Sequence, residues 1–180
     1  MTTFYLLRHG EADFRLPARW RANGWGADLA PLSPRGIEQI QAVAERLGQL
    51  RPEIIISSPM TRSLHSTLLL SGVLRVPCVV EFELHEWVPD LSFSWTTLED
   101  VLASLADLES CGGEWPQGEK RPWEPLSSVR ARVLSVLARY RRYERVLTVC
   151  HGVVIRALTG KREVHCAEIV PFKDTDLPGI

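Results

Sequence analysis

FYLLRHGE at residues 4–11 and VLTVCHG at residues 146–152 have the same sequence pattern. Each is an apolar run that leads directly into a His-Gly pair. Runs of this kind are typical of strands that are covered on both faces of a sheet. We therefore predict that His9 and His151 each follow a buried strand, where the glycine lets the backbone turn sharply and approach a ligand closely.

Further apolar runs also predict buried strands, and segments with helical periodicity lie between them. The predicted strands span Phe4–Leu7, Ile54–Ser57, Cys78–Phe82, Val146–Val149 and Ala167–Phe172. The predicted helices span Ser33–Leu50, Ser58–Ser71, Leu126–Tyr140 and Gly152–Leu158. Strands that alternate with helices need crossover connections, which produce a mainly parallel sheet. The sequence therefore predicts an α/β fold, a three-layer α/β/α sandwich with a mainly parallel central sheet.

Residues 88–125 break this alternation. The segment is rich in proline and carries Trp95, Trp115 and Trp123, with a weak helical pattern at Thr97–Leu108. We predict a single domain over residues 1–180, in which about residues 88–125 form a small helical and loop insertion over the active site. Its tryptophans either line a pocket for a partly apolar substrate, because aromatic walls are common in sites for organic ligands, or pack in the core.

The composition argues against several classes of function. Lys plus Arg total 21 and Asp plus Glu total 22, so the net charge of −1 gives no support for binding nucleic acid or a membrane surface. No apolar run approaches the length of about 20 residues that a transmembrane helix needs. The four cysteines include no Cys-x-x-Cys pair, and the N-terminus lacks the pattern of a secretory signal. We expect a cytoplasmic protein with reduced, buried cysteines and no nucleic-acid or membrane partner; the oligomeric state stays open.

The predicted topology brings the two His-Gly pairs to one edge of the sheet. The carboxyl ends of parallel strands share an edge, and α/β proteins bind ligands there. The strand Ile54–Ser57 leads to the same edge and places Arg62 in the first turn of the next helix, where backbone N–H groups and an arginine favour anions. Arg8, Arg62, the two histidines and two helix starts therefore describe a phosphate pocket. Neutral imidazole can attack phosphorus as a nucleophile, while the arginines neutralise the charge of the transferred group.

Three of these segments, residues 7–11, 57–62 and 149–152, resemble the signatures of the histidine phosphatase superfamily, the phosphoglycerate mutase-like group with an Arg-His-Gly motif. Residues 23–36 are similar to the segment that precedes the first helix in that family. The resemblance spans about residues 4–160, which is most of the chain. It implies a phosphoryl-transferring enzyme in which His9 becomes phosphorylated.

The resemblance also implies roles for the neighbouring side chains. Arg8, Arg62 and His151 would bind the phosphoryl group, so that His151 belongs to both the catalytic and the phosphate-binding residues. The family usually carries an acid after the next strand that protonates the leaving oxygen, and residues 84–86, Leu-His-Glu, match its Leu-x-Glu pattern. Glu86 is therefore the candidate general acid, and a pKa raised by burial would suit that role. Its competitors are two nearby acidic residues, Glu81 and Glu83.

Other positions leave alternatives open. Arg15 stands six residues after His9, where many relatives carry an asparagine that contacts phosphate; it supplies charge in its place or faces solvent. Glu11 matches a family position near the pocket, and we assign it no role. His65 lies one turn after Arg62, where it reaches the pocket edge or lies on the surface.

The favoured function is hydrolysis of a small phosphorylated metabolite. Family mutases are generally longer, and their acid segment continues with basic and aromatic residues, whereas Trp87-Val88-Pro89-Asp90 follow Glu86 here. The alternatives are mutase-type phosphoryl transfer, phosphohistidine protein dephosphorylation and a catalytically silent module that binds phosphorylated ligands. Neither His-Gly pair has metal ligands at the usual spacing, and the arginines supply the positive charge that a metal would. We therefore expect no metal and no cofactor.

Overall fold

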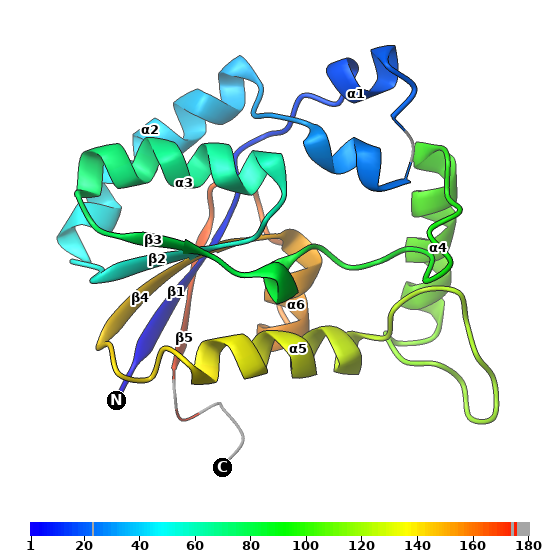
Figure 1. Cartoon of the computed structure of the whole chain (residues 1–180). Helices are drawn as coiled ribbons and strands as arrows, with labels where there is room; N and C mark the ends of the chain where they lie inside the picture. The colour runs from blue at the N-terminus through cyan, green and yellow to red at the C-terminus, as the bar shows by residue number, and fades with distance from the viewer. Residues whose placement is uncertain (23, 174, 176–180) are drawn as a thin grey trace.

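One five-stranded sheet organises the computed structural model, which describes residues 1–22, 24–173 and 175 (Figure 1). Its strands lie in the order β3-β2-β4-β1-β5. Their bounds are β1 (Thr3–Arg8), β2 (Ile54–Ser57), β3 (Cys78–Val80), β4 (Arg145–Cys150) and β5 (Ile169–Lys173). β3, β2, β4 and β1 pair in parallel, and β5 runs antiparallel beside β1. The predicted mainly parallel sheet is confirmed.

Helices cover both faces of the sheet, which confirms the three-layer sandwich (Figure 1). One face carries α2 (Pro34–Gln49) and α3 (Thr61–Leu74), and the other carries α5 (Leu126–Ala138) and α6 (Gly152–Thr159). Ser33 begins α2 as an N-cap whose side chain accepts from the N–H of Gly36, as a serine before a proline predicts. A left-handed Gly160 ends α6.

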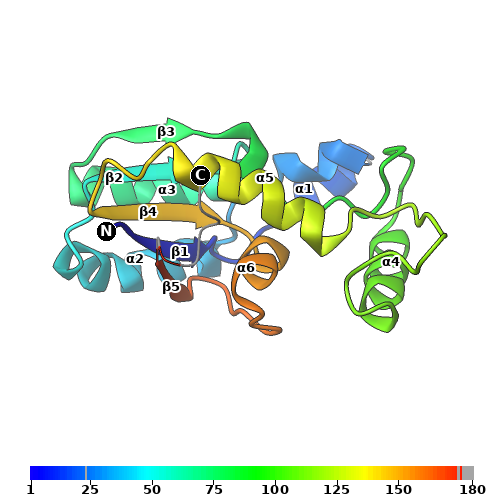
Figure 2. The ribbon, with the colours of Figure 1, turned by 90° about the horizontal axis from the view of Figure 1, so that it is seen from below.

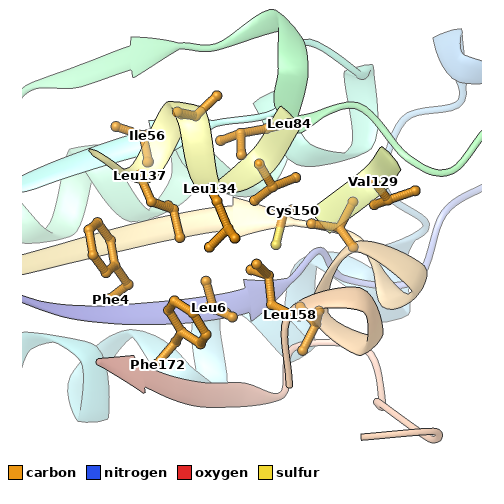
Figure 3. Close-up of a cluster of buried hydrophobic side chains, with 14 of the residues drawn as sticks. Phe4, Leu6, Ile56, Leu84, Val129, Leu134, Leu137, Cys150, Leu158 and Phe172 are labelled. Carbon is orange, nitrogen blue, oxygen red and sulfur yellow. The ribbon is translucent and has the colours of Figure 1, made fainter. Parts of the chain in front are cut away.

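Each face of the sheet has its own apolar core. Neighbouring residues of a strand point to opposite faces, so Leu6 packs with the core beneath α5 and α6, whereas Leu7 packs with the core beneath α2 and α3. Figure 3 shows the first of these cores, where Leu6 meets Leu134 and Leu158. This burial on both sides explains why β1, β2 and β4 are apolar along their length and do not alternate. The expectation that the edge strands are buried too is wrong, since β3 is exposed and β5 is mostly only half-buried.

Several predicted boundaries differ from the structure. The helix expected from Ser58 begins at Thr61, because the chain bends at Pro59 and Met60 before it. The strand expected to end at Phe82 ends at Val80, where the chain turns into the short helix η2 (Phe82–Leu84). Two short elements were not predicted, α1 (Arg15–Arg19) and η1 (Gly24–Leu29).

The cysteines differ among themselves. Cys150 is buried, as expected, but Cys78 is exposed on the edge strand β3, while Cys111 and Cys166 are partly exposed. All four are free thiols.

The insertion contains α4 (Leu98–Ser110), which stands beyond the carboxyl ends of the strands and off the sheet (Figure 2). Thr97 and Asp100 form a capping box at its start. Trp123 is fully buried and donates from Nε1 to Oδ2 of Asp107 (2.7 Å), and Trp115 donates to the carbonyl oxygen of Trp123 (2.9 Å). Two of the insertion's tryptophans therefore fasten its loop to its helix.

None of the helices in the described part of the chain combines the length and the apolar character needed to cross a membrane.

Two glycines let the loop after β1 pack directly on the start of α2. A Cβ atom at Gly36 would overlap the carbonyl oxygen of Glu11, and one at Gly10 would overlap the carbonyl oxygen of Gly36. Ser33 donates its backbone N–H to the carbonyl oxygen of Glu11 (2.8 Å) and its hydroxyl to Oε1 of the same residue (2.7 Å). Glu11 therefore ties the start of α2 to the segment that follows His9.

Replacing Gly36 with alanine should destabilise the protein, because the added methyl group meets backbone atoms that cannot move independently. We expect a loss of about 1–3 kcal/mol in the free energy of unfolding, measured by urea denaturation. Gly72→Ala is the matched control, since a Cβ at Gly72 in α3 meets nothing within 4 Å and alanine favours a helix by up to about 1 kcal/mol. Equal stability of the two variants would contradict this packing argument.

Candidate active site

The pairing of β1 with β4 places two histidines side by side. The strands are neighbours in parallel register, with Arg8 opposite Cys150, so that His9 and His151 leave the sheet together. The backbone N–H of His9 donates to the carbonyl oxygen of Cys150 (3.1 Å), and the two imidazole rings lie edge-on with centroids 5.1 Å apart. Both side chains are buried.

Arg62 reaches this pair from the first turn of α3. Its guanidinium donates from Nε to Nε2 of His9 (3.2 Å) and from Nη1 to Oδ1 of Asp28 (3.0 Å), and Nη2 contacts the sulfur of Met60 (3.1 Å). The arginine is itself buried. A full positive charge is therefore held against the outer nitrogen of His9.

The hydrogen bonds of His9 define its tautomer. Nδ1 lies 2.6 Å from the carbonyl oxygen of Gly10, which can only accept, so Nδ1 carries the proton. Nε2 then keeps its lone pair and accepts from Arg62. Burial, followed by the charges of Arg62 and Arg8, lowers the pKa of His9 from 6.5 to about 3. His9 is thus a neutral imidazole near pH 7, with its unprotonated nitrogen inside the site.

Two buried side-chain nitrogens at the site have no hydrogen-bond partner among the described residues, Nε of Arg8 and Nδ1 of His151. Nε2 of His151 lies 2.7 Å from the hydroxyl of Ser58, which can donate to it and leave the proton on Nδ1. Arg8 is anchored from Nη1 to the carbonyl oxygen of Val164 (2.5 Å). Buried donors are ordinarily paired, so the two nitrogens are suited to bind an acceptor at this site.

The start of α6 lies against the same arginine. A Cβ at Gly152 would lie 3.5 Å from Nε of Arg8, in ordinary contact. The free N–H groups of a helix start add to the positive potential near Arg8. Burial, and then the charge of Arg62, lowers the pKa of His151 far below its usual value. The site therefore presents N–H donors and positive charge without protonated histidines.

Glu86 follows η2 and joins the site from the opposite side. One oxygen of its carboxyl group accepts from the backbone N–H of Trp87 (2.9 Å), and the other accepts from that of Val153 in α6 (3.4 Å). Burial raises the pKa of Glu86, while the backbone hydrogen bonds and the charges of Arg62 and Arg8 oppose the rise. A carboxyl group with a raised pKa can carry a transferable proton near neutral pH.

An arginine that the sequence analysis missed holds the Glu86 segment in place. From α5, Arg132 donates to the backbone carbonyl oxygens of Glu83 (2.5 Å), His85 (2.9 Å) and Glu86 (3.3 Å). The same guanidinium pairs with the buried carboxylate of Glu124 at 2.8 Å and 3.0 Å. No motif marks Arg132 for this role, because the carbonyl oxygens that it binds lie more than 40 residues away in the sequence.

The other sequence candidates form their hydrogen bonds and ion pairs with residues other than the two histidines. The Arg15 side chain is 82% exposed and pairs with Asp13, so its contact with phosphate stays a prediction. Glu81 accepts from the hydroxyl of Tyr140 and pairs with Arg139. His65 is half-buried and accepts from the backbone N–H of Leu32 (3.3 Å), so it supports the loop before α2.

A cleft of about 650 Å³ extends from Arg62 and Glu86 toward the insertion. Its lining includes Asp28, Trp87 and Trp95. Within the described ranges, no three His, Cys, Asp or Glu side chains gather as metal ligands would.

The chain is similar to known proteins over most of its length. A model of the histidine phosphatase superfamily (branch 1) matches residues 4–165. The chain is 29% identical over 170 residues to a metal-independent phosphoserine phosphatase from Arabidopsis thaliana, covering 88% of this chain and 67% of that protein. It is also 29% identical over 164 residues to a probable phosphoglycerate mutase from Proteus mirabilis, covering 88% of this chain and 73% of that protein.

Solved structures share the fold. A mycobacterial glucosyl-3-phosphoglycerate phosphatase in complex with VO3 superposes with a TM-score of 0.72 at 21% identity, over 98% of this chain and 95% of that chain. At this level of identity the likeness supports the α/β/α architecture described above.

The environment of His9 predicts an unusual titration. In an NMR pH titration, the His9 ring should change protonation with a midpoint at about 3, and the signal is assigned by its absence in His9→Gln. Arg62→Gln should raise this midpoint while leaving it below 6.5, because burial is the larger cause and persists. A midpoint near 6.5 in the unaltered protein would contradict the neutral, buried imidazole.

The lowered pKa of His9 also makes the free energy of unfolding depend on pH. Between pH 6.5 and about 3 the unfolded chain binds a proton at His9 that the folded chain does not. His9 therefore lowers the free energy of unfolding as the pH falls through this range.

Proposed function

The chain belongs to the histidine phosphatase superfamily, branch 1, and on that premise we propose that it hydrolyses small phosphomonoesters through a phosphohistidine formed at His9. The observation that carries this proposal is the pairing of a neutral His9, whose Nε2 keeps its lone pair, with unpaired buried donors on Arg8 and His151. A phosphoryl group has a negative charge and acceptor oxygens that would complete the hydrogen bonds of these donors.

The first half of the reaction forms the covalent intermediate. Nε2 of His9 attacks phosphorus, while Arg62, Nε of Arg8 and Nδ1 of His151 stabilise the charge on the phosphoryl oxygens. The bond from phosphorus to the ester oxygen breaks, and Glu86 gives its proton to that oxygen, so the alcohol leaves neutral. The hydrogen bond from Nδ1 of His9 to Gly10 keeps the ring oriented as it becomes positively charged.

The second half returns the enzyme to its starting state. Glu86, now a carboxylate, accepts a proton from a water molecule as the water oxygen attacks phosphorus. The bond between phosphorus and Nε2 breaks, and inorganic phosphate leaves a neutral His9 and a protonated Glu86. Side chains of this chain stabilise the charge of the phosphoryl group and transfer the protons, so the proposal includes no metal and no cofactor.

Phosphoryl transfer of the mutase type is the second candidate, favoured by the match to a probable phosphoglycerate mutase. The two candidates share the phosphohistidine and differ in the acceptor. Incubation with 3-phosphoglycerate tests the second candidate, since a mutase yields the 2-phospho isomer, whereas a hydrolase yields none of it.

Rapid alkaline quenching after mixing with ³²P-labelled phenyl phosphate should trap label on the protein, stable in base and labile in acid. His9→Asn should carry no label. His165→Asn is the matched control, because this histidine is largely exposed, and it should be labelled as the unaltered protein is. Label that survives acid, or label in His9→Asn, would overturn the assignment.

Glu86→Gln should have an effect that depends on the leaving group. An alkyl alkoxide leaves poorly without a proton, whereas p-nitrophenolate leaves readily, so the loss should be about 10²–10⁴-fold on an alkyl phosphate and far smaller on p-nitrophenyl phosphate. Glu83→Gln serves as the control and should retain both activities. Equal losses on both substrates would indicate a structural or binding role for Glu86, and an unchanged alkyl rate would transfer the assignment to Glu81, Glu83 or Glu11.

A further inference from the structure

The cleft that leads away from Glu86 has walls that the proposed phosphoryl chemistry does not need. Its inner end is formed by Arg62 and Glu86, and its walls include Trp25, Trp87 and Trp95. Its volume of about 650 Å³ is that of a site for an organic molecule. A leaving group bonded to a phosphoryl group on His9 would extend into this space.

Aromatic rings from two distant segments meet here. The ring of Trp25 lies 5.4 Å from that of Phe93 and 6.2 Å from that of Trp95, and the latter two lie 5.9 Å apart. Trp25 and Phe93 remain 37% and 47% exposed. The cluster therefore leaves ring surface uncovered beside the cleft, whereas Trp115 and Trp123 are used in packing the insertion.

The loop that carries Phe93 and Trp95 is held in shape without a ligand. The carboxylate of Asp90 accepts from the backbone N–H groups of Ser92 (2.8 Å) and Ser94 (3.2 Å) and from both hydroxyls. Opposite it, Gly24 has a positive φ of 55° and packs against the backbone of residues 93 and 95. A preformed wall of this kind lowers the entropic cost of binding a flat ring.

The charges in the cleft disfavour an acidic leaving group. Asp28 and Glu86 both line it, and Arg62 is already shared between Asp28 and His9. Among the described lining residues, the remaining cation is the exposed Arg21. A carboxylate on the leaving group would meet the carboxylate of Asp28 and, among the described lining residues, no buried cation that is free to pair with it.

We propose that the cleft selects phosphomonoesters of uncharged alcohols that carry an aromatic ring, and that Trp25 and Trp95 determine this specificity. The inference rests on the proposed function of the His9 site and names its class of substrate. It separates this chain from a specificity for phosphoserine or phosphoglycerate, whose leaving groups carry a carboxylate.

The test compares three phosphate esters of primary alcohols, 2-(2-naphthyl)ethyl phosphate, butyl phosphate and phosphoserine. All three need the same proton from the acid, so differences in kcat/KM report chiefly on the cleft. We expect kcat/KM for the naphthyl ester to exceed that for butyl phosphate at least ten-fold, mainly through KM, with phosphoserine the poorest. A preference for phosphoserine, or equal values for the two uncharged esters, would overturn the proposal while leaving the phosphatase function intact.

Variants locate the effect in the cleft. Trp95→Leu and Trp25→Leu should each reduce the ratio of naphthyl to butyl kcat/KM to about three-fold or less. Trp20→Leu is the control, because Trp20 is 79% exposed and does not line the cleft; its ratio should match that of the unaltered protein. Trp25 is already partly exposed, so its replacement provides a second variant if Trp95→Leu fails to fold. A ratio unchanged in both cleft variants would contradict the assignment.

Calorimetric binding of inert phosphonates makes the result independent of turnover. 2-(2-Naphthyl)ethylphosphonate should bind at least ten-fold more tightly than butylphosphonate, and Trp95→Leu should remove most of this difference. If no phosphate ester is hydrolysed, the proposed function fails, yet this binding difference still supports the cleft. Equal affinities for the two phosphonates would overturn the cleft proposal in either case.

Discussion

The parallel pairing of β1 with β4 is the constraint on which the site depends. Six residues of each strand lie in register, and the last pair joins Arg8 to Cys150. Because both strands end at the same level, the backbone of His9 bonds to Cys150 and the ring of His151 stands beside that of His9. A register shift of one residue would turn every side chain of a strand to the other face and would separate the two rings.

The site concentrates positive charge in a buried place, and the state of its histidines follows from that. Arg8 and Arg62 remain charged, and both lower the pKa of His9 together with burial. A neutral His9 can attack phosphorus, which a protonated ring cannot. Each buried donor left without a partner costs about 1–3 kcal/mol, so the proposed anion site at Arg8 and His151 would come with some loss of stability.

The carboxyl group of Glu86 connects the phosphate end of the site with the cleft. Its position depends on Arg132, which donates to the carbonyl oxygens of Glu83, His85 and Glu86. Arg132 is itself paired with Glu124. Glu124 in turn accepts from the backbone N–H of Val88, at the start of the insertion. The buried ion pair of Arg132 with Glu124 therefore holds both the backbone at Glu86 and the start of the insertion at Val88.

The sequence by itself determined the features that depend on local pattern. Apolar runs without polar alternation predicted a sheet that is covered on both faces. Two such runs lead into His-Gly pairs, which predicted that His9 and His151 lie at the same edge of the sheet. Arg62 was placed in a first helical turn, although its helix begins at Thr61 and not at Ser58. Tertiary structure alone decided the partners: that Asp28 shares Arg62, that Arg132 and Glu124 hold the acid loop, and that Trp95 faces a cleft while Trp123 is buried. These contacts join segments with no common periodicity, so they exist only once long-range packing has brought the segments together.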